Sequence, residues 1–167
     1  AGAVTNQLID LDADTKIEVE QSADEDFIRM STAGAEVVTV NPSGNVGIRT
    51  NTPDRDLHVT GDAVTPTGQV VITRNDINTT NGESLGDLMF DSEDDSGPSS
   101  THASVMLRAV ATQDHGDSDK GGELRIYTKA NSVDGSANAT ERMSIEQNGD
   151  VRIGASSSSG NDLYIND

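Results

Sequence analysis

Residues 37–48 read VVTVNPSGNVGI, and residues 142–153 read RMSIEQNGDVRI. In both stretches apolar residues recur at alternate positions, a polar turn containing glycine follows, and the alternation then resumes. Alternation of period two around a short turn predicts a β-hairpin with one apolar face. The turn glycines, Gly44 and Gly149, lie 105 residues apart. The chain therefore contains the same predicted hairpin twice.

A second short signal follows each hairpin. Residues 56–59 read DLHV and residues 162–165 read DLYI, and their leucines, Leu57 and Leu163, lie 106 residues apart. A shared order of motifs at nearly one offset indicates a chain built from modules. Modular β-chains usually build structure rather than carry out chemistry. Because the second copy stops at this signal, we expect either a further module beyond it or a half-module that caps an assembly.

The composition supplies little material for a monomeric core. Leu, Ile, Val and Phe make up 34 of 167 residues, and the aromatic residues are two Phe and two Tyr, with no Trp. Chains with so few large apolar residues and a high net charge border on disorder. Either the chain is partly disordered, or it completes its core with further copies of itself. The regular alternation favours assembly, because disordered segments rarely keep a period of two.

The charge balance excludes several classes of partner. Asp and Glu number 29 against 11 Lys and Arg, which gives a net charge of −18. Nucleic acid and anionic membrane surfaces would be repelled, and no apolar stretch approaches the roughly 20 residues that span a bilayer. A trimer would need divalent counter-ions or widely spaced charges. Since cysteine is absent, there is no disulfide and no thiolate ligand.

The pattern predicts an all-β fold of antiparallel hairpins and a meander, without helices. We expect an N-terminal hairpin module at 1–60, a joint at 61–68, a central meander with long polar loops at 69–140 and a truncated hairpin module at 141–167. Within the meander, strands are predicted at 69–74, 85–90, 104–111 and 123–129, from β-branched and apolar runs bounded by Gly, Ser, Asn and Asp.

Several stretches resemble the repeats of bacteriophage tail fibres and related virion appendages. They are NPSGNVGIRTNTP at 41–53 with LHV at 57–59, ERMSIEQNGDVRIG at 141–154, and the weaker GGELRIY at 121–127. The resemblance implies a homotrimer in which β-strands of three chains wind about one axis, located in the virion or outside the cell. Two positions depart from the glycine-rich version of the hairpin, namely Arg49 in the first copy and Arg152 in the second.

Three aspartates at alternate positions, Asp10, Asp12 and Asp14, match the start of many calcium loops. A full loop would continue with glycine at the sixth position and glutamate at the twelfth, where this chain has Thr15 and Gln21. A solvated acidic turn is therefore favoured over a calcium site. Calorimetric titration with calcium would distinguish the two, since a solvated turn should give no heat of binding.

Other titratable groups give weaker signals. The acidic run 91–95 is typical of a solvated loop. We expect His58 and His102 to be surface residues. His115, with the aspartates of 114–119, is an alternative metal site that lacks a second histidine nearby.

We expect no enzyme, no catalytic residue and no cofactor. No nucleophile elbow, phosphate loop or catalytic triad stands out, and 29 acidic residues make any carboxylate pair uninformative. The expected function is structural, as part of a phage tail or head fibre that contacts itself and other virion proteins. Loops 91–101 and 112–122 are the expected contacts with a host receptor, which adsorption assays on loop deletions would test.

The alternative is a capsid decoration protein or an extracellular filament subunit that uses edge-strand contacts, with 155–167 as a donated strand. A secreted binding or enzymatic domain is a third possibility.

Overall fold

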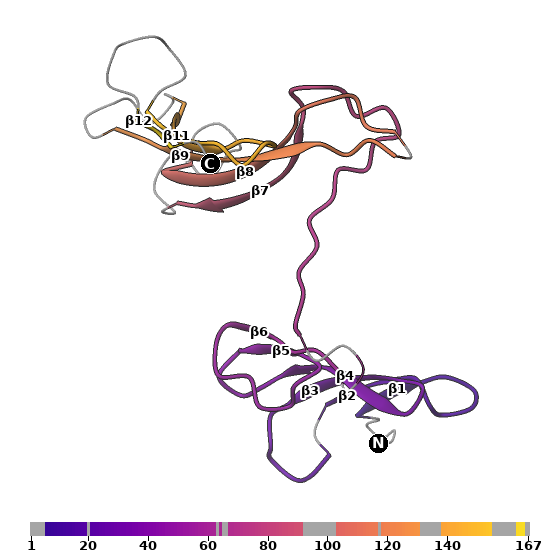
Figure 1. Ribbon diagram of the computed structural model, residues 1–167. Coiled ribbons are helices and arrows are strands. Elements are labelled where there is room, and N and C mark those ends of the chain that lie inside the picture. The colour runs from indigo at the N-terminus through magenta and orange to yellow at the C-terminus, as the bar shows by residue number, and fades with distance from the viewer. Residues whose placement is uncertain are drawn as a thin grey trace. The chain divides into compact units, whose positions relative to one another are not determined.

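The computed structural model describes residues 6–19, 21–62, 64, 67–91, 103–116, 118–130, 138–154 and 163–165. The contacts divide the chain into an N-terminal unit, Ala1–Val71, and a C-terminal unit, Ile72–Asp167. Each unit holds one sheet, and every regular element in the described residues is a strand (Figure 1). The predicted all-β fold is confirmed.

The N-terminal sheet has six strands in sequence order. They are β1 (Gln7–Ile9), β2 (Lys16–Val19), β3 (Ile28–Thr32), β4 (Ala35–Val40), β5 (Val46–Ile48) and β6 (Leu57–Val59). Neighbours pair antiparallel from β1 to β5, and β4 and β5 form the first predicted hairpin. Strand β6 departs from the antiparallel pattern, because it runs parallel to β5.

The direction of β6 follows from a sharp turn after β5. Arg49 has a left-handed backbone, with φ of 59°. At Gly47 an added Cβ would lie 2.2 Å from the carbonyl oxygen of Thr50. The chain thus folds back over the end of β5, and residues 49–56 return it to the start of that strand, where the amide of Val46 donates to the Asp56 carbonyl at 2.8 Å. Strand β6 then begins beside the start of β5 and runs the same way.

The C-terminal sheet is an antiparallel meander, also of six strands. They are β7 (Ser84–Phe90), β8 (Val105–Ala111), β9 (Gly122–Thr128), β10 (Thr140–Ile145), β11 (Val151–Ile153) and β12 (Leu163–Ile165). Each strand pairs antiparallel with the next. The second predicted hairpin is β10 and β11.

The strand predicted at 69–74 is wrong. These residues have no partner in either sheet, although Val70, Val71, Ile72 and Thr73 are all β-branched. Side-chain contacts hold the end of the segment instead. The side chain of Ile72 approaches Gly86 so closely that an added Cβ would lie 2.6 Å from its Cγ2 atom. Arg74 pairs with Glu83 at 2.8 Å.

The two hairpins repeat each other in their main-chain hydrogen bonds. In the first turn, the amide of Asn41 donates to the Asn45 carbonyl and that of Gly44 to the Asn41 carbonyl, at 3.0 and 2.8 Å. The second turn repeats both bonds 105 residues later, from Glu146 to Asp150 and from Gly149 to Glu146. Gly44 and Gly149 both have positive φ, 84° and 93°, a conformation in which glycine carries no steric cost.

The overlay also relates the residues that follow the two hairpins. The bond from Arg49 to the Val37 carbonyl is repeated by the bond from Gly154 to the Arg142 carbonyl. Gly154 also has positive φ, 130°. Gly154, and not Arg152, is therefore the counterpart of Arg49, while Arg152 occupies the position of Gly47.

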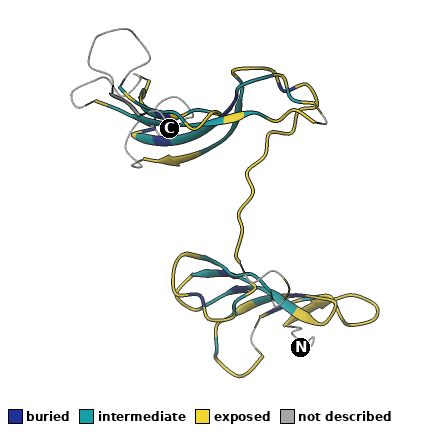
Figure 2. Ribbon diagram, in the orientation of Figure 1, coloured by how far each residue is buried: buried dark blue, intermediate teal, exposed yellow. Residues whose placement is uncertain are grey.

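Little apolar surface is buried within either unit. Among the described residues, the buried apolar side chains other than Pro53 are Ala103, Met106, Val110 and Ala111, all in the C-terminal unit. The buried polar residues are Glu18, Ser31, Thr39, Thr79 and Ser144. Figure 2 shows mostly intermediate and exposed residues on both sheets. Among the described residues, no second layer of regular structure packs over either sheet, although a β-domain normally has one.

Candidate assembly surface

The apolar residues of the N-terminal sheet lie in two rows on one face. Residues paired directly across strands point to the same side of a sheet. The first row is Leu8, Ile17, Met30, Val38, Ile48 and Val59. The second row is Val19, Ile28, Val40, Val46 and Leu57. Between them, on the opposite face, runs a row of Gln7, Glu18, Arg29, Thr39, Gly47 and His58.

The burial of these two faces is inverted relative to a monomeric β-domain. Ile17, Ile28 and Leu57 on the apolar face are 42%, 41% and 59% exposed. Glu18 and Thr39 on the polar face are 4% and 1% exposed. The unit therefore covers its polar face and leaves its apolar face open to solvent. Leu8, Ile17 and Met30 of the apolar face line part of a hollow of about 420 Å³, which polar residues such as Thr15 and Ser31 also line.

The C-terminal sheet also leaves one apolar face open, but its opposite face buries the apolar side chains of Met106 and Val110 beside polar ones. One row of its first face is Leu88, Leu107, Ile126, Met143 and Ile153, and a second is Ala109, Leu124, Ile145 and Val151. Leu88 and Ile153 are exposed. The opposite face carries a row of Asp87, Arg108, Arg125, Ser144 and Arg152. Ser144 in that row is buried. Both units therefore present an apolar face that nothing in the described residues covers.

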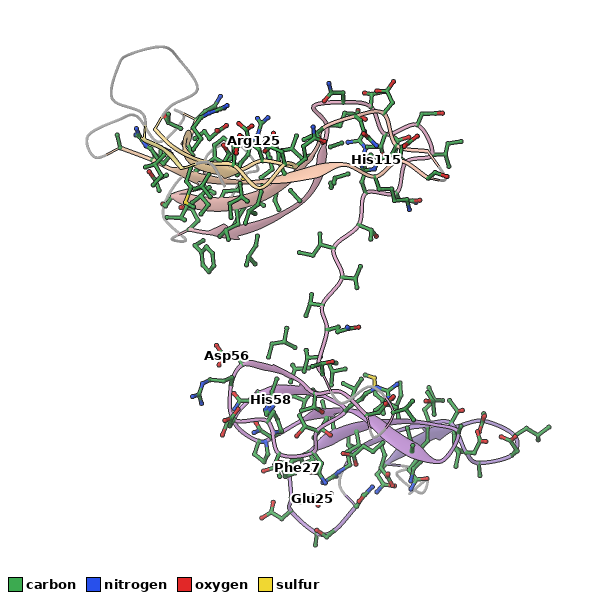
Figure 3. All side chains as sticks on the ribbon, viewed as in Figure 1. Glu25, Phe27, Asp56, His58, His115 and Arg125 are labelled. Carbon is green, nitrogen blue, oxygen red and sulfur yellow. The ribbon has the colours of Figure 1, made fainter. Side chains whose placement is uncertain are left out.

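On the polar face of the N-terminal sheet, an arginine on β3 contacts two carboxylates and an aromatic ring. Arg29 donates to Glu25 at 2.6 Å and lies 3.3 Å from a carboxylate oxygen of Glu36. Its guanidinium also stacks over the Phe27 ring, 4.5 Å from the centroid, a favourable cation–π contact. Thr39 donates to Glu36 at 2.5 Å. Figure 3 shows Glu25 and Phe27 together in the connection before β3.

The same arrangement recurs in the C-terminal sheet. Arg125 on β9 donates to Glu123 at 2.6 Å and lies 3.6 Å from Glu141 on β10. Glu141 and Ser144 follow Glu36 and Thr39 by 105 residues. A bulge lies at the same place in each ladder, between Met30 and Ser31 and between Glu141 and Met143. The repeated module therefore consists of three strands, β3–β5 in the first copy and β9–β11 in the second, and it includes a charged cluster.

Sequence reasoning missed this cluster. The offset of 105 residues already relates Glu36 to Glu141 and Thr39 to Ser144, so that signal was readable. Arg29 and Arg125 lie 96 residues apart instead. The connection between β9 and β10 is longer than the one between β3 and β4, which shifts the arginine out of the common offset.

The cluster makes the N-terminal unit sensitive to acid. The hydrogen bond from Arg29, aided by the backbone amide of Gln21, lowers the pKa of Glu25 from about 4.5 to about 2. A carboxyl whose pKa is depressed by folding stabilises the fold above its unfolded pKa. That stabilisation is lost as pH falls from about 4.5 toward about 2.

We therefore expect Glu25→Gln to be less stable than the parent at neutral pH, and the difference to shrink over this window. Thermal unfolding followed by circular dichroism at several pH values measures it. A difference that stays constant down to the acid limit would show that Glu25 is not linked to folding through its charge.

The structure brings the three predicted aspartates together. Asp10, Asp12 and Asp14 lie at the β1–β2 turn, all exposed, each with a carboxylate oxygen within 4.8 Å of the others. The backbone amide of Thr15 donates to Asp10 at 3.2 Å and is the main cause that lowers the pKa of this carboxyl. Hydrogen bonds of the turn itself account for this arrangement, and calcium binding stays a prediction.

The predicted histidine sites behave as structural groups. The ring Nε2 of His115 lies 3.0 Å from the Gly121 carbonyl, and its backbone amide donates to Thr79 at 2.9 Å. Within the described residues, His115 does not join two acidic side chains at ligand distance. His58 lies half-buried, with Nδ1 3.0 Å from an Asp54 oxygen. His102 lies outside the described residues.

The structure describes most of one predicted receptor loop and almost none of the other. Loop 91–101 lies outside the described residues apart from Asp91, and so does most of the acidic run 91–95. Loop 112–122 is described apart from residue 117. Asp114 accepts a bond from the Asn81 amide at 2.9 Å, and the Thr112 hydroxyl donates to Gln147 at 3.0 Å. These bonds fasten loop 112–122 to its own unit.

In the part of the chain that the structure describes, no helix is long and apolar enough to cross a membrane. No protein-family model and no curated protein sequence matches the chain.

Proposed function

We propose that this chain is a structural segment of a bacteriophage fibre or related virion appendage, in which three copies bury their apolar sheet faces against one another. The observation that carries the proposal is the open apolar face of both sheets, which in the N-terminal sheet lies opposite a buried polar row. Ile17, Ile28 and Leu57 remain exposed while Glu18 and Thr39 are buried. A lone sheet with one open apolar face is poorly stable in water. The apolar face of one copy can be buried against the same face of another copy.

The charge distribution supports contact through these faces. Both apolar rows of the N-terminal sheet contain only apolar residues, although the whole chain has a net charge of −18. Like charges would therefore lie away from the joining surface. The polar row, in which the unit itself already buries Glu18 and Thr39, would lie on the side away from the joining surface.

The role that follows is mechanical and not enzymatic. Repeated hairpins set the spacing along the fibre, and polar loops such as 112–122 are displayed from it. Host attachment through these loops and through 91–101 belongs to the same proposal, as does a location in the virion or outside the cell.

The native mass in solution tests the proposal directly. We expect light scattering to give a fixed mass of three chains over a wide concentration range. A mass that grows with concentration would overturn the closed trimer and favour the filament or decoration protein, since contacts that do not close produce filaments. A folded monomer at all concentrations would overturn assembly itself.

A further inference from the structure

The segment from Gln69 to Thr73 has the composition of a strand without the pairing of one. It reads QVVIT, and β-branched residues of this kind are favoured in sheets. Val70 and Val71 are 71% and 77% exposed. None of these five residues forms a backbone hydrogen bond with any described part of the chain. Figure 1 shows the segment as an extended trace outside both sheets.

Contacts hold the segment at each of its ends. At Gly68 an added Cβ would lie 2.3 Å from the Val59 carbonyl oxygen, so the chain passes closely over the end of β6. Near the other end of the segment, Ile72 is in contact with Gly86 on β7, and just beyond it Arg74 forms ion pairs with Asp76 and Glu83, both at 2.8 Å. Val70 and Val71 therefore lie in an extended stretch whose two ends are anchored.

We propose that residues 69–73 form a strand between copies of this chain, each segment pairing with the same segment of its neighbours. This inference rests on the proposed self-assembly. In a rotationally symmetric assembly, residues that lie close to the symmetry axis also lie close to the same residues of the other copies, and we place this segment there. Residues 63–73 contain no charged side chain, so identical copies meet there without like-charge repulsion. Pairing would also satisfy backbone groups that otherwise only water can satisfy.

Hydrogen exchange of the assembled, full-length protein tests the proposal. We expect the amides of 70–73 to exchange at least about tenfold more slowly in the assembly than in the chain diluted to monomer, because paired amides must open before they exchange. Rapid exchange in a confirmed trimer would overturn the inter-chain strand and leave the proposed function standing. A chain that is monomeric throughout would overturn both. Protection that persists in the monomer would show an intrachain partner and overturn the inference.

A matched pair of variants tests whether the pairing partner of residues 69–73 is a second copy of the chain. Val71→Lys places like charges where the copies would meet, so we expect the protection of 70–73 to disappear. The added charge reduces the net charge of −18, so greater overall repulsion cannot explain the loss. Ile77→Lys makes the same kind of change at a site 92% exposed beyond the segment, and should leave the protection intact. Equal protection in both variants would exclude a second copy as the partner.

Discussion

Met30→Lys should dissociate the assembly. Met30 lies in the middle of the first apolar row, between Ile17 and Val38. Burying one such side chain contributes about 1.5–3 kcal/mol, and a lysine there would have to bury a charge or keep the faces apart. The loss recurs in each of three copies, so the assembly constant should fall by at least about 1,000-fold. Light scattering at matched concentrations measures the change.

Leu11→Lys is the matched control. Leu11 lies in the β1–β2 turn with its side chain fully exposed, so the same change of chemistry falls outside the apolar face. We expect its native mass to equal that of the parent. Circular dichroism of Leu11→Lys should match that of the parent, whereas Met30→Lys should also lose strand signal once dissociated, because a lone sheet with one open apolar face is poorly stable in water. If the Met30→Lys variant remained a trimer, the apolar face could not be the interface between copies.

The sequence patterns predicted local structure well where alternation and turn chemistry coincide. The hairpins around Gly44 and Gly149 have their expected strands, since the glycines take the positive φ that the turns require. The meander strands also agree to within a residue or two at each end. In these places each strand pairs with its neighbour in sequence, so period and turn are sufficient to specify the pairing.

Prediction failed where pairing depends on something beyond the local pattern. Residues 69–74 have strand composition, but propensity alone supplies no partner. The direction of β6 depends on the left-handed Arg49 and on the space at Gly47, and neither is visible as a hydrophobic period. The Arg29 and Arg125 clusters join residues at two different offsets, which only the folded ladders bring together.

The same principle applies to the candidate surface. Alternation placed Ile17, Val19, Ile28 and Met30 on one side of the predicted strands. It could not show which side the unit covers, because coverage depends on how the connecting segments fold over the sheet. In the structure the ion-paired side is covered, with Glu18 buried and Ile17 exposed.

Arg29→Ala should destabilise the N-terminal unit, because it leaves Glu25 and Glu36 without their shared cation. The arginine side chain is only 11% exposed, so water cannot fully replace it. Arg29→Lys should recover part of the loss. Lysine keeps the charge, but it lacks the planar fork that reaches both carboxylates and the Phe27 ring. Arg55→Ala, at a side chain 79% exposed, should change stability by less than about 0.5 kcal/mol.

The distribution of tyrosine allows the two units to be followed separately. Both tyrosines, Tyr127 and Tyr164, belong to the C-terminal unit. In urea unfolding at one fixed protein concentration, Arg29→Ala should lower the midpoint of the N-terminal transition in circular dichroism and leave the tyrosine fluorescence transition in place. Arg125→Ala should shift the fluorescence transition, since its cluster repeats that of Arg29. If Arg29→Ala moved both transitions equally, the units would unfold as one cooperative body, and the arginine clusters would not be local determinants of stability.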